Sequence, residues 1–411
     1  MRRLSGLIAV PLLAMGAGTP LAAGEGSGTN NADLFNPSAT PSSVMPREAM
    51  DPYFNVDWSL AIRGAYSIDS GGSEGAVLVI PQFTLTHQGG RVSSSVTGSG
   101  EVSVNDQGES RISALRLSAD GSYAFDAAMA ATGSVDVSLS QADPDDPSLP
   151  TNTMTAPVVI SGDAEGSVVR RLGRLEASLR GSLGRSFNGE TVLDDMSTID
   201  NTPLNDWRAG AGSRLGFALT PVLTPYLDGS AQWQRYDAPD PTLLVYLDAV
   251  TTAGKVGVSY SPNSRLSADA AIGLAWRDYV DASLTDTGAL TADGSVTLKP
   301  DETLTLTASL TTGLAPSATV PSDTTASYDA GAGVAYVVNP WVTLRGSVGY
   351  GLDRILGTGD QAQNASLGAG FDYRLNAHTA LTGDYAFTRT DNPPAPVADE
   401  HSVALGVTFS R

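Results

Sequence analysis

The sequence contains no cysteine. Disulfides, thiolate metal sites and cysteine nucleophiles are therefore excluded. Beyond the N-terminal segment there is also no run of the ~18 apolar residues that a membrane-spanning helix needs. Aromatic residues make up only 7% of the 411 residues and hydrophobic residues 41%. These shares are low for the cores of a conventional soluble protein of this length.

Basic residues and histidine are scarce as well. Lysine and arginine number 24 against 44 acidic residues, which gives a formal net charge of −20. Phosphate binding needs a basic face, so no nucleic-acid partner is expected. The three histidines, His87, His378 and His401, are expected near turns or strand ends rather than in a His-centred catalytic constellation. The sequence predicts no enzyme activity, no cofactor and no metal site.

The N-terminus predicts export from the cytoplasm. Arg2 and Arg3 precede an apolar run over 4–15 and a small-residue exit over 21–24. This is the pattern of a cleaved secretory signal peptide, which we place at residues 1–24. Residues 25–50 are rich in Ser, Asn, Pro and Gly without periodicity, which predicts a disordered periplasmic lead-in. Residues 51–411 are predicted to form a single domain.

That domain alternates apolar and polar residues with period two. In HSVALGVTFSR (401–411), Val403, Leu405, Val407 and Phe409 share one face, and small or hydroxyl residues share the other. Helical periodicity is nowhere sustained, so the segments are predicted to be strands. Tight corners alternate with longer polar connections, and the repeating hairpin is about 40 residues long. Roughly nine such hairpins fit, which predicts about 18 strands, with 16 as the alternative.

The tight corners share a small shape that VNPWVTLRGS (338–347) illustrates. A corner residue is followed by an alternating strand, and Pro, Asn and Asp favour such turns. We place the recurring corners at Pro221, Pro262, Pro300, Pro340 and Ala377. The longer connections are predicted at about 142–156, 188–206, 238–248, 315–324, 354–362 and 391–398.

These patterns favour a transmembrane antiparallel up-and-down β-barrel over a sandwich, propeller or solenoid. The polar face carries charges in mid-strand while the apolar face continues from strand to strand. Only a closed sheet satisfies every backbone group in lipid, with one face on acyl chains and the other on water. Short turns then lie in the periplasm and long loops outside the cell. A soluble adhesin or surface-layer protein stays open as an alternative.

Three segments carry a resemblance to a known family. They are SGDAEGSVVRRLGRLEASLRGSLGRSFNG, DWRAGAGSRLGFALTPVLTPYLDGSAQWQRYD and LGAGFDYRLNAHTALTGDYAFTRTDN with the ending HSVALGVTFSR. Over roughly residues 50–411 the sequence resembles the family known as "putative β-barrel porin type 2", which consists of outer-membrane proteins. The resemblance implies an outer-membrane barrel of 16–18 strands in a Gram-negative bacterium. It also implies that some relatives serve exopolysaccharide export, and it supplies no catalytic or ligand residues.

A barrel of this size leaves an aqueous channel. The residues predicted to line the pore are charged and lie on the polar face: Arg63, Arg116, Asp136, Arg180, Asp228, Lys255, Asp269, Arg277, Asp329, Arg345, Asp353, Asp372, Arg374 and Asp384. The same face adds Asp57, Glu101, Asp120, Asp163, Glu165, Glu176, Asp293, Arg208 and Arg214. Acids therefore outnumber bases, which predicts a porin-like channel for small polar solutes with a mild preference for cations. Pairing of opposite charges across strands, which would merely stiffen the wall, is an equal alternative for each residue.

Two uses of such a pore stay open at this point. One is passive diffusion, and the other is export of an exopolysaccharide with periplasmic export partners. The remaining expected partners are outer-membrane lipid, lipopolysaccharide and the barrel-assembly machinery. Asp194, Asp195, Asp200 and Asp206 could bind Ca²⁺, although a solvated loop is the preferred interpretation.

Overall fold

The structure is a computed structural model. It describes residues 53–68, 72–105, 108, 110–142, 144, 149–150, 152–316, 323–392 and 397–411. The predicted signal peptide and lead-in lie outside these residues. Within them, no helix is long and apolar enough to cross a membrane.

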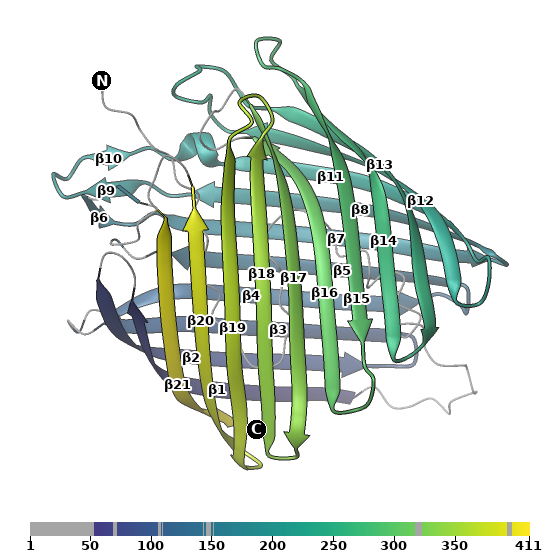
Figure 1. The fold of residues 1–411 in the computed structure, drawn as a ribbon, viewed down its shortest axis with the longest axis horizontal. Helices are drawn as coiled ribbons and strands as arrows, with labels where there is room; N and C mark the ends of the chain where they lie inside the picture. Colours follow the sequence, from purple (N-terminus) through teal and green to yellow (C-terminus); the bar gives the residue numbers. More distant parts are fainter. Residues whose placement is uncertain are drawn as a thin grey trace.

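Eighteen strands form one closed antiparallel sheet (Figure 1). Each strand pairs with its neighbours in sequence, as an up-and-down barrel requires. The strands are β1 (Tyr53–Ile68), β2 (Ser73–Gln88), β3 (Val92–Asn105), β4 (Ser110–Ala124), β5 (Met129–Gln141), β7 (Val158–Leu172), β8 (Leu175–Asn188), β11 (Asp206–Phe217), β12 (Leu223–Tyr236), β13 (Ala249–Asn263), β14 (Leu266–Tyr279), β15 (Thr287–Leu298), β16 (Leu304–Pro316), β17 (Thr324–Asn339), β18 (Val342–Ile355), β19 (Gln361–Asn376), β20 (Thr379–Asp391) and β21 (Ala398–Ser410).

The last strand closes the barrel on the first. β21 pairs with β1 from Ser410, opposite Ser59, to His401, opposite Ile68. Two further backbone bonds join Trp58 and Arg411, at 3.2 and 3.0 Å. The predicted fold class is confirmed, and the count is 18 strands rather than 16.

Asn or Asp side chains fix several of the short turns. Asn263, Asp301, Asn339 and Asn376 each accept a hydrogen bond from the backbone N–H two residues later, at 2.8–2.9 Å. These are Asx turns, in which the side chain replaces a backbone acceptor. The predicted corners lie at turns, but their prolines do not occupy an equivalent position. Proline precedes the Asn or Asp acceptor in two of these turns and follows it at Asn339. The position of proline varies because the turn depends on the side-chain oxygen and merely tolerates proline.

The longer connections leave the opposite end of the barrel. Two of them pair with each other through β6 (Thr153–Thr155), β9 (Thr191–Leu193) and β10 (Thr198–Ile199), which make a small separate sheet (Figure 1). A short 3-10 helix, η3 (Thr202–Leu204), follows β10. The arrangement of short turns at one end and longer loops at the other matches the prediction. In outer-membrane barrels short turns lie in the periplasm and long loops outside the cell, so we expect the same orientation here.

The two faces of the wall differ as lipid and water require. Large apolar side chains point outward and stay exposed, such as Leu183 in β8 and Ile272 in β14, both 62% exposed. Trp207, Trp233 and Trp276 are exposed near the loop end, as expected of an interfacial girdle. We call this the outer face, and the face with charged and hydroxyl side chains the inner face.

Candidate functional site

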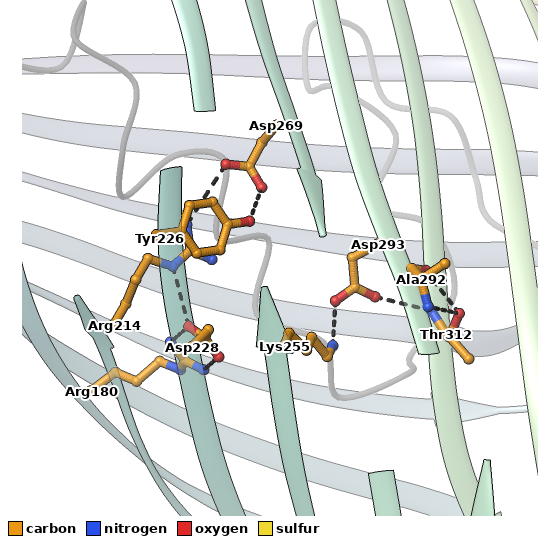
Figure 2. Close-up of polar contacts among 9 residues, drawn as sticks. All are labelled: Arg180, Arg214, Tyr226, Asp228, Lys255, Asp269, Ala292, Asp293 and Thr312. Carbon is orange, nitrogen blue, oxygen red and sulfur yellow. Dashed lines mark hydrogen bonds and ion pairs between the residues drawn. The ribbon is translucent and has the colours of Figure 1, made fainter. Parts of the chain in front are cut away.

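Charged side chains on the inner face form networks that span several strands. The largest surrounds Asp228 of β12 (Figure 2). Arg180 of β8 donates two hydrogen bonds of 2.7 Å to its carboxylate, and Arg214 of β11 donates a third at 3.1 Å. Arg214 also lies 3.7 Å from Asp269 of β14 and 3.9 Å from the ring centroid of Tyr226. One acid therefore holds two arginines, and the second arginine connects it to the next acid.

The Tyr226 hydroxyl completes this network. It donates a 2.6 Å hydrogen bond to Asp269, whose other oxygen accepts one from Ser259. Arg214 and Asp228 are 3% and 7% exposed. A buried carboxylate with this many donors has its lone pairs satisfied, which makes removal of one partner costly.

A second network lies where the barrel closes. Arg63 of β1 reaches Asp384 of β20 at 3.2 Å, and Arg345 of β18 contacts the same carboxylate at 3.0 Å. Arg345 is also 3.0 Å from Asp372 of β19. The network connects β1 to β18 across the junction of the first and last strands. It therefore reinforces the seam that joins the two ends of the sequence.

The remaining pairs are smaller, and one of them joins Arg171 of β7 to Glu176 of β8 at 2.5 Å. Arg116 contacts Asp136 at 3.1 Å, and Arg208 lies 3.6 Å from Asp163. Lys255 of β13 pairs with Asp293 of β15. Together, the predicted pore-lining residues that enter ion pairs are Arg63, Arg116, Asp136, Arg180, Asp228, Lys255, Asp269, Arg345, Asp372 and Asp384.

Five of these pairs skip one strand, and a glycine of the skipped strand lies beneath each of the five. Gly212 of β11 lies between Arg180 and Asp228, and a Cβ there would be 2.6 Å from Arg180 Nε. The same relation holds for the other crossings, where the intervening glycines are Gly184, Gly273, Gly370 and Gly406. Only a residue without a side chain lets the guanidinium or ammonium cross so close to the sheet. We call these residues the saddle glycines.

The remaining predicted residues enter no ion pair in the described part of the chain. Asp329 of β17 and Asp353 of β18 lie on neighbouring strands without a basic partner, and Arg374 near the turn end has no acidic one. Arg277 is 2% exposed and donates to Gln234 at 2.9 Å and Thr251 at 3.3 Å. The inner face thus divides into paired charges and a smaller set that keeps its charge available.

The loop end of the inner face carries an apolar cluster that the sequence did not predict. Leu247, Ala249, Tyr279 and Leu284 are buried together, with Tyr236 packed against them. Tyr236 and Tyr279 continue the inner rows of β12 and β14, so residues of loops 237–248 and 280–286 pack on the inner side of the mouth. The sequence feature that could have indicated this cluster is the tyrosine that ends each inner row. Tyr226 was likewise missed, because a lone tyrosine in a strand does not reveal its partner.

The acidic loop residues serve the loop itself. Asp195 accepts hydrogen bonds from Ser197, and Asp200 from Thr202. In both cases the hydroxyl bond is the main cause that lowers the pKa of the carboxyl below its ordinary value, and the backbone bond adds to it. Within the described ranges, no group of three or more His, Asp or Glu side chains could hold a metal ion.

The histidines lie apart from one another. The ring of His87 stacks on that of Phe54, with ring centroids 4.5 Å apart. His401 Nδ1 forms a 2.9 Å hydrogen bond with the Tyr385 hydroxyl. His378 lies 3.1 Å from the Ser410 carbonyl oxygen. None of these histidines is bonded to both a nucleophile and an orienting acid, so these contacts make no hydrolase triad.

A closed 18-stranded barrel with a charged inner face and an apolar outer face defines a bacterial outer-membrane protein of the porin type. The family model "Putative beta-barrel porin 2" matches residues 65–411, and the chain belongs to that family. The predicted family resemblance is confirmed. Membership implies a channel rather than an enzyme.

No curated protein sequence matches the chain. Solved structures of similar shape include OccK2 (OpdF) from Pseudomonas aeruginosa, with a TM-score of 0.45, 12% identity and coverage of 87% of this chain and 98% of that one. OccAB4 from Acinetobacter baumannii has a TM-score of 0.41, 11% identity and coverage of 89% and 100%. The anion-selective porin from Comamonas acidovorans has a TM-score of 0.37, 13% identity and coverage of 88% and 100%. The chain spans 62% of the length of the FrpB iron transporter from Neisseria meningitidis, at a TM-score of 0.43 and 8% identity.

Proposed function

We propose that the protein forms a porin-like aqueous channel for small polar solutes, with a mild preference for cations. A barrel of 18 strands is wide enough for water to fill it. The inner face offers many hydroxyl groups, including the bonded pairs Thr132–Ser167 and Ser138–Ser161. Such a wall exchanges hydrogen bonds with hydrated ions and neutral sugars alike.

The charges left over after ion pairing carry the preference for cations. Among the predicted inner-face carboxylates in the described ranges, those without an ion pair are Asp57, Glu101, Asp120, Glu165, Asp329 and Asp353. Of the predicted inner-face bases in the described ranges, only Arg277 and Arg374 lack one. Paired charges largely cancel at a distance, so the potential in the lumen follows this acidic remainder.

The proposal includes the secretion of the protein to the outer membrane that the sequence predicts. Residues 1–24 act as the signal peptide, the barrel-assembly machinery inserts the protein, and the outer face contacts lipid and lipopolysaccharide. An export pore for an exopolysaccharide would use the same hydroxyl-rich wall. No contact among the described residues favours it over diffusion.

Planar-bilayer conductance with a reversal potential in a salt gradient tests the proposal. The refolded protein should give stable open steps and a reversal potential of cation-selective sign. The double variant Asp329→Asn/Asp353→Asn should lower the cation preference, because both groups face the lumen without a basic partner. The control Asp195→Asn/Asp200→Asn removes two charges from a loop and should change it less. Anion preference in the unmodified protein, or no effect of the inner-face variant, would contradict the assignment.

A further inference from the structure

One seam of the barrel wall is only partly hydrogen-bonded. β15 and β16 share five register pairs, from Gly294 opposite Leu310 to Leu298 opposite Leu306. By contrast, β14 and β15 share 12 pairs, and β16 and β17 share 13. Towards the loop end, residues 287–293 therefore pair only with β14, and residues 311–316 only with β17. We call this part of the wall the β15–β16 window.

The window is a considerable length of unpaired strand edge. Six residues of β16 correspond to about 20 Å at ~3.3 Å per residue. It lies in the extracellular half of the wall, where the outer leaflet of the membrane is. In hydrocarbon an unpaired backbone group is costly, so an edge of this length needs other partners.

Side chains supply those partners at the lower end of the window (Figure 2). The Thr312 hydroxyl donates to the Ala292 carbonyl oxygen at 2.8 Å and accepts from the Ala292 N–H at 3.1 Å. Asp293 accepts from the Thr312 N–H at 3.3 Å, and its other oxygen pairs with Lys255. A few side-chain bonds thus replace a continuous ladder, and rotation of one side chain removes two of them.

The chemistry changes across the window from apolar to polar. On the outer face lies Leu290, 63% exposed, and the Tyr328 hydroxyl reaches the Leu290 carbonyl oxygen at 3.4 Å. On the inner face lie Asp293 and Thr291, and the Thr291 hydroxyl is buried without a hydrogen-bond partner among the described residues. A buried hydroxyl without a partner costs free energy unless a ligand or water satisfies it. The window therefore offers an apolar entrance from lipid and polar groups towards the lumen.

We propose that the β15–β16 window is a lateral passage through which a single-chain amphiphile moves between the lumen and the outer leaflet. Thr312 and the Lys255–Asp293 pair act as its latch. The window lies in a single interstrand seam, so we expect the passage to suit one extended hydrocarbon chain and not a multiply acylated lipid. The passage needs a lumen but not ion conduction, so it can be tested separately from the channel function.

The absence of native cysteine allows a clean labelling test. Thr291→Cys places a thiol on the inner side of the window. Ser327→Cys is the matched control, because β17 has continuous ladders on both sides at this height. Each variant is refolded into phosphatidylcholine vesicles and treated with N-dodecylmaleimide, delivered from the bilayer, or with a sulfonated maleimide in water. The ratio of the lipid-phase rate to the aqueous rate should be several-fold higher for Thr291→Cys than for Ser327→Cys.

The latch is tested in the Thr291→Cys background. Thr312→Val keeps the shape but removes both hydroxyl bonds, and it should raise the ratio further, whereas Thr312→Ser should leave it unchanged. If Thr312→Val does not give the heat-modifiable folded band, Lys255→Gln frees Asp293 without altering either edge strand and should also raise the ratio. Equal ratios for the window variant and the β17 control would overturn the lateral passage. So would a ratio that no latch variant changes.

Discussion

Replacing a saddle glycine tests whether the inner-face ion pairs depend on the bare backbone beneath them. In Gly212→Ala the new methyl group would lie 2.6 Å from Arg180 Nε. This is closer than side chains approach each other, so the guanidinium has to shift, and we expect it to lose the 2.7 Å bonds to Asp228. The register partners of Arg180 are Gly212 on β11 and Ser167 on β7, so neither of them is an acid that could replace Asp228.

The size of the effect follows from burial. The side chains of Arg180 and Asp228 are 13% and 4% exposed, so their pair counts as buried. Breaking a buried ion pair costs about 3–5 kcal/mol, because it leaves an uncompensated charge. Replacing glycine by alanine returns about 0.4–1 kcal/mol through the entropy of the unfolded chain. Gly212→Ala should therefore destabilise the barrel by about 2–4 kcal/mol.

The matched control is Gly229→Ala on the adjacent strand β12. A methyl group there meets no atom within 4 Å, so the variant should be neutral or slightly stabilised. Equilibrium urea unfolding in lipid vesicles, followed by tryptophan fluorescence, gives both free energies. In an Arg180→Met background the cost of Gly212→Ala should disappear, because no guanidinium crosses residue 212. Equal stability of the Gly212 and Gly229 variants in the native background would refute the saddle argument.

Two further predictions concern the faces and the turns. Leu183→Arg places a charge on the outer face in mid-strand and should lower the free energy of unfolding by about 2–4 kcal/mol. Ser182→Arg, on the inner face, should lower it far less. Urea unfolding measures both variants, and equal losses would contradict the assigned faces. Hydrogen bonds lower the pKa of the Asp301 carboxyl below its ordinary value. The largest effect comes from the Thr303 hydroxyl, and the backbone N–H groups of Thr303 and Leu304 add smaller ones. A carboxyl with a lowered folded-state pKa stabilises the protein above its unfolded pKa of about 4, and this contribution is lost as the pH falls through the folded value. Asp301→Ala should therefore be less stable than the native chain at neutral pH, with a difference that shrinks in acid unfolding below about pH 4, and a difference independent of pH would argue against the turn role.

The positions of the short turns could be predicted only approximately from proline. The recurring shape was real, but its shared physical element is the acceptor oxygen of Asn263, Asp301, Asn339 and Asn376. Proline is easy to see in a sequence because it breaks strands, whereas an Asx turn needs the direction of a side chain. Aligning the corners on their Asn or Asp residues would have located the turns more accurately.

The sequence by itself determined the strands and their two faces, because the direction of a strand side chain depends only on its place in a local alternation of period two. The strand count followed from the hairpin period, and the class of protein from the need to satisfy the backbone in lipid. Tertiary structure decided which charges meet. Arg180 and Asp228 are 48 residues apart and skip a strand, and the partial β15–β16 ladder arises between two strands whose sequences look ordinary. Both depend on register and closure around the whole barrel, and pairing between distant residues sets these.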